Sequence, residues 1–531
     1  MQNLCIPVLI LTLVCVPTVI GVIETVYDIE PEFERADYLP RLSDVCMRSV
    51  MPHEGETVMD NTILAAQAIH ATRLDWVYPY TNTAWVEKIR AAGLDIQPTL
   101  NANMSDEPGG DTWDKGRMVD VHGNKITAPW MTWEGTNWGC CSTDGWREAW
   151  MAWAKYYADL KPSSFQHDDQ RMNGHAVLWK PGKAGPNNTG PGCFCDDCVR
   201  GFSKFLAEKG KVFSLEEHKF IRRADETAPI PFFDIKQYVL EHVKDQNLRQ
   251  APEELRKEFE LFQQQSVRQF LAECRKELNE YAGRYIPISC NGIPAVEGTP
   301  MDTFDFGIRE LSYPNASPAY LYDIFRKSAQ TGKAQIFTMP KPHDRAGVTD
   351  WDKEYPHLKH LVRKCIASSY AFGGHMMVPW DIYMPRDNPR YFGKPEDYAY
   401  LFKMIRENAA LFDGYAAANT CGYEIPPRDD NKPAPVAIQG GSGKVCAAVR
   451  VQPGKPDAPA VIHVVEWDEQ NTKPLEITLN KSSFKSGGEE LEIDVIFNDK
   501  QEETAFAVTQ KSDTCTVSLP AVETWAIITV K

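Results

Sequence analysis

Between about residues 44 and 415 the chain repeats one pattern, a short apolar run followed by a stretch with helical spacing of its apolar positions. This alternation is typical of βα units. The eight apolar runs that we assign to strands are residues 45–51, 73–80, 94–103, 163–170, 285–292, 303–311, 334–342 and 375–383. Only the link between the fifth and sixth runs is short and poor in helix. The pattern predicts an α/β fold, a closed (β/α)8 TIM barrel over residues 24–420.

Two further regions depart from this repeat. A long segment near residues 171–260 follows the fourth run and overlaps the start of a helical pattern at 254–282. We expect this segment to form a helical insertion that shapes a cleft. After Pro426 the stretch PPRDDNKPAP is typical of a linker. Residues 431–531 then alternate polar and apolar positions between turn residues, with no helical spacing. They predict an all-β C-terminal sandwich domain.

The N-terminal segment has a different character. Residues 4–23 are apolar and uncharged, and an acidic stretch follows directly. This favours a signal peptide at residues 1–23, so we expect a secreted or periplasmic protein with no membrane attachment after cleavage. The alternative is an uncleaved anchor, because the run approaches the length of a membrane span. Pro7 and Pro17 count against a long helix there.

Composition narrows the class of protein. The 531 residues include 43% hydrophobic and 24% charged side chains, as in an ordinary folded globular protein. The 73 acidic side chains outnumber the 57 basic ones, which gives a net charge of −16. Nucleic-acid binding needs clustered Lys and Arg to replace counterions, so we expect no nucleic-acid partner. The sequence does not indicate an oligomeric state.

The C-terminal ends of the predicted strands are rich in polar, acidic and aromatic residues, and the active sites of (β/α)8 barrels lie at that end. Carboxylates supply acid/base groups, amides bind hydroxyls and aromatic faces stack on pyranose rings, so the set suits a carbohydrate substrate. A single Trp in a large barrel is nevertheless more often packed between helix and strand. The candidate substrate-binding residues are Asn101, His167, Gln170, Asn291, Arg309, Lys341, His343, Trp380 and Asp381.

Asp168 and Asp169 at the end of the fourth run are candidate catalytic residues. If Phe165 faces the helices, strand alternation turns Asp168 into the barrel and turns His167 and Asp169 away from it. Asp168 is therefore the first choice for contact with substrate. The alternative is an aspartate that caps the following loop or helix. Two adjacent carboxylates repel each other, which makes packing a poor explanation for this pair.

Glu310, at the end of the run at 303–311, is the second candidate catalytic carboxylate. Its alternative role is a salt bridge with Arg309 or another neighbour. Asp381 is a third acid at the same rim. A glycosidase needs two opposed carboxyl groups, about 5 Å apart for retention and about 6.5–9.5 Å for inversion.

The sharpest local motif is GCFCDDC, which places Cys193, Cys195 and Cys198 in close spacing. Three thiolates suit a tetrahedral metal such as zinc, and Cys140 or Cys141 can supply the fourth ligand. A zinc ion held by four cysteines is structural, because no position is open for substrate. Disulfide formation after export is the alternative. The sequence has no Ser-His-Asp elbow, P-loop, dinucleotide fingerprint or HExxH helix, so we expect no organic cofactor.

These features resemble glycoside hydrolase family 42 and, equally, the uncharacterised barrel glycosidase-like families related to it. The resemblance rests on a cysteine before a Trp-Arg helix, acids at the end of the fourth strand, and the stretch GCFCDDCVRGF. It implies a structural zinc held by Cys140 or Cys141 with Cys193, Cys195 and Cys198. The sequence departs from the family at the catalytic positions. Asp169 and Gln170 stand where the family has Asn-Glu, and the seventh strand lacks its Glu.

The aspartate on the fourth strand is instead similar to that of the α-galactosidase-like barrels. That analogy implies Asp168 as nucleophile and Glu310 as acid/base. We therefore predict an exported glycoside hydrolase that acts on an oligo- or polysaccharide. The alternatives are a catalytically silent glycan-binding barrel, and a polysaccharide lyase with His167 or Tyr313 as base.

Overall fold

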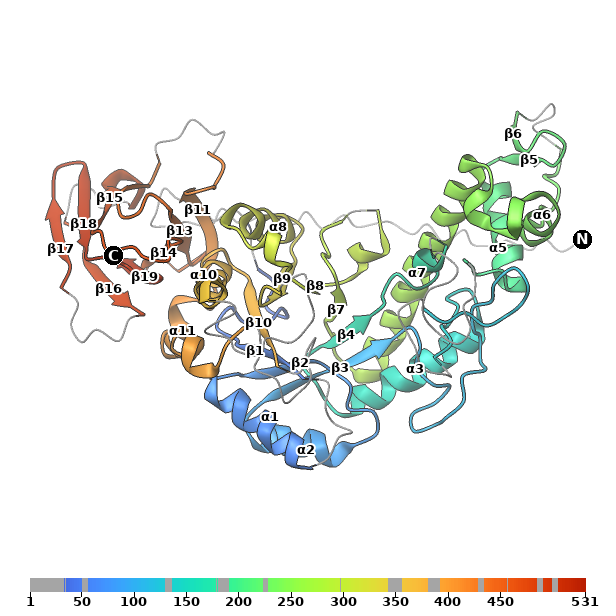
Figure 1. Cartoon of the computed structure of the whole chain (residues 1–531), viewed down its shortest axis with the longest axis horizontal. Coiled ribbons are helices and arrows are strands. Elements are labelled where there is room, and N and C mark those ends of the chain that lie inside the picture. Colours follow the sequence, from blue (N-terminus) through green and yellow to red (C-terminus); the bar gives the residue numbers. More distant parts are fainter. Residues whose placement is uncertain are drawn as a thin grey trace, which may run out of the picture.

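The computed structural model contains a barrel, a projecting insertion and a C-terminal β-domain (Figure 1). The predicted signal peptide at residues 1–23 and the candidates His343 and Asp381 lie outside the described residues. The described residues are 33, 35–49, 56–128, 136–177, 179, 191–222, 228–296, 298–341, 356–380, 392–427, 434–455, 457–484, 490–498 and 505–531.

Eight parallel strands form a closed barrel in the order β1-β10-β9-β8-β7-β4-β3-β2, which confirms the predicted fold. The strands are β1 (Cys46–Arg48), β2 (Arg73–Val77), β3 (Asp95–Asn101), β4 (Phe165–Asp168), β7 (Ile288–Asn291), β8 (Phe306–Arg309), β9 (Ala334–Thr338) and β10 (His375–Pro379). Every residue of β2, β9 and β10 is buried, because these strands are covered on both faces. That double burial explains why the strands are visible in the sequence as continuous apolar runs.

Helices follow most of the strands and cover the barrel. They are α1 (Glu56–Ala68), α2 (Thr83–Ala91), α3 (Asp144–Asp159), α8 (Pro318–Gln330), α10 (Pro356–Ala371) and α11 (Pro395–Glu407). Between β7 and β8 the described chain forms only a short 3-10 helix at Pro300–Thr303, as the helix-poor link predicts. None of the described helices combines the length and apolar character that crossing a membrane requires.

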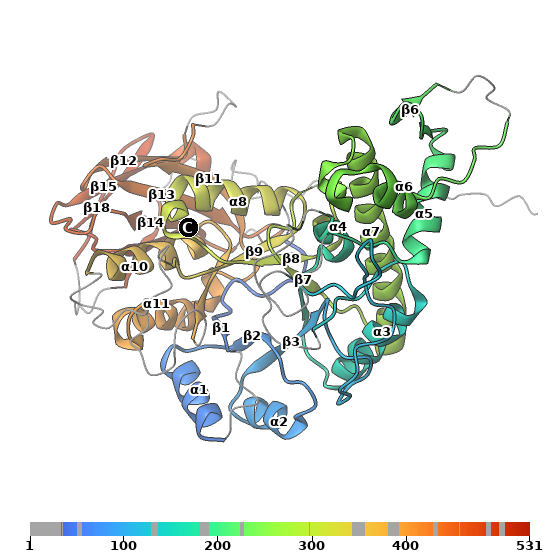
Figure 2. The ribbon, with the colours of Figure 1, turned by 45° about the vertical axis from the view of Figure 1, so that its right-hand side comes forward.

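The insertion after β4 projects from the barrel (Figures 1 and 2). It contains α4 (Met172–Ala176), α5 (Asp196–Glu208), the hairpin of β5 (Val212–Ser214) and β6 (Lys219–Ile221), and α6 (Ile235–His242). The 30-residue helix α7 (Glu253–Ala282) returns the chain to the barrel.

Two antiparallel sheets form the C-terminal domain. One has the order β11 (Ala416–Gly422), β13 (Val445–Val451), β14 (Ala460–Glu466), β19 (Trp525–Val530), β16 (Ile493–Phe497). The other has the order β12 (Val436–Gly440), β15 (Leu475–Asn480), β18 (Thr514–Leu519), β17 (Ala507–Gln510). β11 joins its sheet from before the predicted linker, so the domain takes residues from upstream of residue 431.

The C-terminal domain packs against the barrel. All residues of β13 and β14 are buried, because one face of their sheet packs in the sandwich and the other packs in a core shared with barrel helices. The buried Arg450 donates hydrogen bonds to the carbonyl oxygens of Ala371 and Tyr415 across this junction. The two domains therefore share a continuous apolar core.

Candidate active site and metal centre

Asp168, the last residue of β4, is held by hydrogen bonds at the C-terminal end of the barrel. Its Oδ2 accepts from the Tyr78 hydroxyl at 2.7 Å and from the Trp76 indole N–H at 3.3 Å. Its Oδ1 accepts from the Asn291 side-chain amide at 2.9 Å and from the Asp169 backbone N–H at 3.0 Å. Asp168 remains partly exposed. Four donors thus fix the orientation of an accessible carboxylate at the barrel mouth.

Trp76 and Tyr78 were not among the residues predicted from the sequence. Trp76 lies near the end of β2 and Tyr78 directly follows the strand. The register of β2 with β3 shifts between Leu74 and Val77, and Trp76 has a left-handed φ of 55°. Simple alternation places Trp76 on the same outer face as Leu74. The bulge instead turns Trp76 into the barrel and leaves Val77 in the outer core. The aromatic end of the run at 73–80 is the only sequence signal that could have indicated these two donors.

His167 lies on the opposite face of β4 from Asp168, as the alternation predicts. Its ring is fully buried between β4 and α3, where Nε2 accepts a hydrogen bond from the Trp150 indole N–H at 3.1 Å. Burial lowers the pKa of His167 to about 4. The ring stays neutral near pH 7 and does not reach the mouth of the barrel.

Asp169 follows with a left-handed φ of 53° and a half-buried side chain. Burial, and after it the charge of Asp168, raise the pKa of Asp169 well above its usual range. Burial and the Asp168 charge likewise hold the pKa of Tyr78 well above 10. Tyr78 therefore keeps its proton and remains a donor to Asp168, while Asp169 loses its proton at a higher pH than an ordinary aspartic acid.

Glu310 comes directly after β8 and forms an ion pair with Lys341. The side chains of the two residues are 30% and 16% exposed, so the pair is only partly desolvated. Lys341 belongs to the segment after β9, which is bridged to Ser312. The structure thus pairs the two candidates Glu310 and Lys341. A salt bridge is the alternative role that the sequence analysis gave for Glu310. β7 separates β4 from β8 in the barrel.

The remaining described candidates lie at the same rim. Asn101 is paired in register with Asp168, and its Oδ1 has no hydrogen-bond partner among the described residues. Gln170 is buried and donates to the Asn291 carbonyl at 2.9 Å. Arg309 is half-buried at the end of β8. The backbone N–H of Trp380 donates to the carbonyl of Arg48, and its side chain packs against the outer core.

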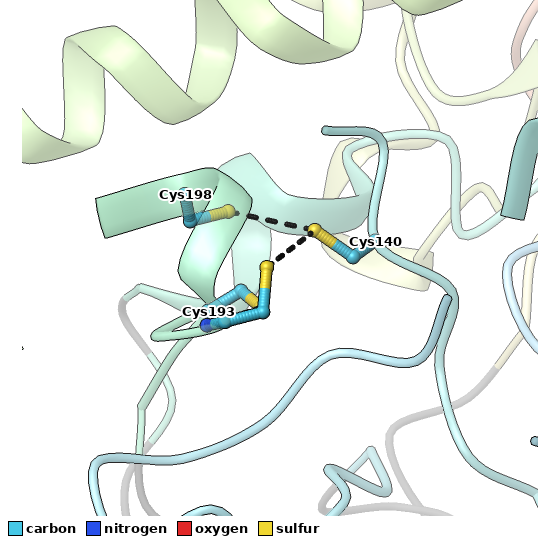
Figure 3. A group of neighbouring side chains, drawn as sticks. Cys140, Cys193 and Cys198 are labelled. Atoms are coloured by element: carbon cyan, nitrogen blue, oxygen red, sulfur yellow. Dashed lines mark hydrogen bonds between the residues drawn. The ribbon is translucent and has the colours of Figure 1, made fainter. Parts of the chain in front are cut away.

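The four cysteines Cys140, Cys193, Cys195 and Cys198 converge, and their sulfur atoms all lie within 4.8 Å of one another. Figure 3 shows the labelled side chains of Cys140, Cys193 and Cys198 turned toward one another. The sulfur of Cys140 lies 3.6 Å from that of Cys195 and 3.4 Å from that of Cys198. Cys141 faces away and contacts the Met172 thioether, so Cys140 is the fourth member of the cluster.

Nitrogen donors surround these sulfur atoms. The backbone N–H groups of Val119 and Cys195 each donate to the Cys193 sulfur at 3.4 Å. The side-chain amide of Asn173 donates to the Cys140 sulfur at 3.2 Å, and its oxygen accepts from the Cys141 backbone N–H. Donors of this kind stabilise thiolates and orient metal ligands.

The cluster therefore fits a metal ion. Tetrahedral coordination with metal–sulfur bonds of about 2.3 Å requires sulfur atoms about 3.8 Å apart, close to the separations found here. All twelve described cysteines, including these four, are free thiols. Four sulfur ligands leave no open coordination position, so an ion held here would be structural. The cluster joins the loop before α3 to the first turn of α5, beside α4 and α7.

No protein-family model and no curated protein sequence matches this chain. Solved structures resemble it at 7–13% identity. An α-amylase from H. orenii has a TM-score of 0.48 and 10% identity, covering 92% of this chain and 99% of its own. A maltogenic α-amylase from Thermotoga neapolitana has a TM-score of 0.45 and 10% identity, covering 92% and 96%. A β-galactosidase from Marinomonas ef1 has a TM-score of 0.41 and 13% identity, covering 69% and 60%.

Proposed function

We propose that this protein is an exported glycoside hydrolase that acts on an oligo- or polysaccharide at the mouth of its barrel. The observation that carries the proposal is the Asp168 carboxylate, which four donors orient at the C-terminal end of β4 while part of it stays accessible. A carboxylate held in this way supports attack on an anomeric carbon or activation of water. Export, to the periplasm or out of the cell, rests on the segment at residues 1–23.

Asp168 acts as nucleophile or base in this proposal. As nucleophile it forms a bond to the anomeric carbon, the bond from that carbon to the leaving oxygen breaks, and a neighbouring acid donates its proton to that oxygen. Water then releases the sugar and returns the proton. Tyr78 and Asn291 position the attacking carboxylate through their hydrogen bonds.

Two residues are candidates for the proton donor. Glu310 lies after β8, and two strand spacings of about 4.8 Å each separate β8 from β4, which allows the two side chains to face each other across a sugar. Glu310 is ion-paired with Lys341, a contact that substrate must displace for Glu310 to reach the leaving oxygen. Burial, and after it the charge of Asp168, raise the pKa of Asp169, so Asp169 keeps its proton to a higher pH than an ordinary aspartic acid. Asp169 is therefore the alternative donor.

We further propose that the ion held by Cys140, Cys193, Cys195 and Cys198 is structural zinc. Zinc accepts four thiolates in tetrahedral geometry and has no redox chemistry of its own. The ion would fix the loop before α3 against the insertion that follows β4. Every catalytic step above is carried out by side chains of the chain itself.

The test measures reducing-end release from a panel of oligosaccharides and polysaccharides by the parent, Asp168→Asn, Asp169→Asn and Glu310→Gln. We expect Asp168→Asn to lower turnover at least about 1,000-fold. Of the other two variants, the one that loses comparable activity identifies the proton donor. Circular dichroism verifies that each variant is folded.

Three outcomes would contradict the proposal. Full turnover in Asp168→Asn would place the nucleophile elsewhere. Products that absorb in the ultraviolet would indicate a lyase. Glycan binding without any turnover in the parent would indicate a silent glycan-binding barrel, in which the Glu310–Lys341 pair is purely structural.

A further inference from the structure

The insertion after β4 extends beyond the C-terminal ends of the barrel strands. Residues 273–282 of α7 pack beside α3, through the contacts of Arg147 with Glu273 and of Tyr281 with Asp159. Gln263 of the same helix accepts a hydrogen bond from Asn173 of α4, the short helix that follows β4. Gln263 therefore lies at the level of the tip of β4. The ten residues before Gln263 therefore continue past the tip of β4, by about 15 Å at 1.5 Å per residue. The rest of the insertion packs beside this part of α7 (Figure 2).

A pocket of about 380 Å³ lies in the insertion, between α5, β5 and α6. Its aromatic side chains include Phe213, Phe233 and Tyr238, whose rings pack together with centroids 5.0–5.8 Å apart. Gln237 and Glu241 line the pocket from α6, and their side chains are hydrogen-bonded to each other. The pocket thus combines an aromatic wall with an amide and a carboxylate.

Two large apolar side chains stand exposed among the residues that line this pocket. Phe232 is 63% exposed and Leu215 is 53% exposed. Apolar side chains grouped with polar ones around a hollow are typical of a ligand-binding surface. Neither residue belongs to the site around Asp168.

We propose that this pocket is a second carbohydrate-binding site, which holds a distant part of the glycan whose reacting bond lies at Asp168. The inference rests on the proposed function, because a carbohydrate is the expected ligand only if the barrel acts on one. A volume of 380 Å³ is at the small end of the range for small-molecule pockets and suits one or two sugar rings. Phe232 offers a face for a pyranose ring, and Gln237 and Glu241 offer donors and acceptors for its hydroxyls.

The position of the pocket favours a polymer over a short sugar. The insertion leaves the barrel directly after β4, whose last residue is Asp168, and its helix α7 rises past that tip. A chain bound at both places raises its effective concentration at the catalytic end, so the second site increases apparent affinity only for long substrates.

The test uses affinity electrophoresis in native gels that contain soluble starch, xylan, β-1,4-galactan or polygalacturonate. All proteins carry Asp168→Asn, which prevents hydrolysis during the run. Phe232→Ala and Gln237→Ala alter the pocket, and Leu64→Ala is the matched control because Leu64 is 61% exposed on α1, outside the pocket. We expect at least one polysaccharide to retard the background protein and the Leu64→Ala control equally. The two pocket variants should bind at least fivefold more weakly.

A second measurement separates this inference from the proposed function. With Asp168 intact, Phe232→Ala should keep kcat/KM on disaccharides and lose at least fivefold on the polysaccharide that the parent binds. Equal retardation of all variants, or no retardation in any gel, would overturn the second site even if the parent hydrolyses glycans. Weaker binding by the pocket variants, with no turnover by the parent, would overturn the hydrolase and leave the pocket as a glycan-binding site.

Discussion

The adjacent residues Cys140 and Cys141 should respond in opposite ways to the same substitution. Cys140 has its sulfur 3.4 Å and 3.6 Å from the sulfur atoms of Cys198 and Cys195, whereas the Cys141 sulfur lies against Met172. Cys140→Ser removes one of the four sulfur ligands that would hold the proposed metal ion. Cys141→Ser makes the same chemical change one residue away and leaves all four in place.

The expected magnitude follows from binding linkage. A metal at a free concentration 1,000 times its Kd stabilises the folded state by about 4 kcal/mol. At about 2 °C per kcal/mol, the value for domains of a few hundred residues, loss of the ion lowers Tm by about 8 °C. We therefore expect Cys140→Ser to lose its metal and about 8 °C in Tm. Cys141→Ser should keep one ion per chain and stay within about 2 °C of the parent.

The assay is metal analysis by mass spectrometry of protein purified with zinc, alongside thermal unfolding before and after chelation. Chelation of the parent should reproduce the Tm of Cys140→Ser. Equal metal loss in both serine variants would refute the assignment of Cys140. A metal-free parent whose four cysteines resist alkylation until reduced would establish disulfides in place of the metal centre.

Three further outcomes follow from single contacts. Asn173→Leu removes the amide that donates to the Cys140 sulfur, so metal affinity should fall about 10- to 100-fold in competition with a chromophoric chelator. Tyr78→Phe removes a donor to the Asp168 carboxylate worth about 1.5–3 kcal/mol, so kcat/KM should fall about 10- to 150-fold on a glycan that the parent cleaves. The pKa of His167 is about 4 in the folded protein and about 6.5 in the unfolded protein. Between these pH values only the unfolded state protonates this histidine, so the folded state loses stability as the pH falls from 6.5 to 4. His167→Gln should reduce that loss, measured by urea unfolding, by about 3 kcal/mol.

The barrel could be predicted because its strands are covered on both faces. A strand such as β9 or β10 is buried at every position, which leaves a continuous apolar run between polar segments. The sandwich was visible for a different reason, since strands such as β15 and β18 alternate in burial. β11 was not predicted, because its sequence, AAANTCG, has neither signature and precedes the linker after which the sandwich was expected to begin.

The candidate site was predictable only where strands are regular. Phe165 and Asp168 follow the simple alternation of β4, so the orientation of Asp168 could be inferred from the sequence. Trp76 lies in a bulge and Tyr78 follows it, and no periodic rule indicates where a strand gains a residue. The choice between Cys140 and Cys141 depends on the path of the loop before α3, which spacing alone does not determine.

The four-cysteine cluster and Asp168 are connected through the short segment that follows β4. Asn173 is five residues beyond Asp168, and its side chain donates to Cys140 and Cys198 and to Gln263 of α7. Asp169 and Met172, between them, both have left-handed φ angles, which tertiary contacts must hold in place. Loss of the proposed zinc ion would remove one of those constraints while the barrel core is untouched. Catalytic geometry at the tip of β4 should therefore fail at lower chelator concentrations than the fold itself.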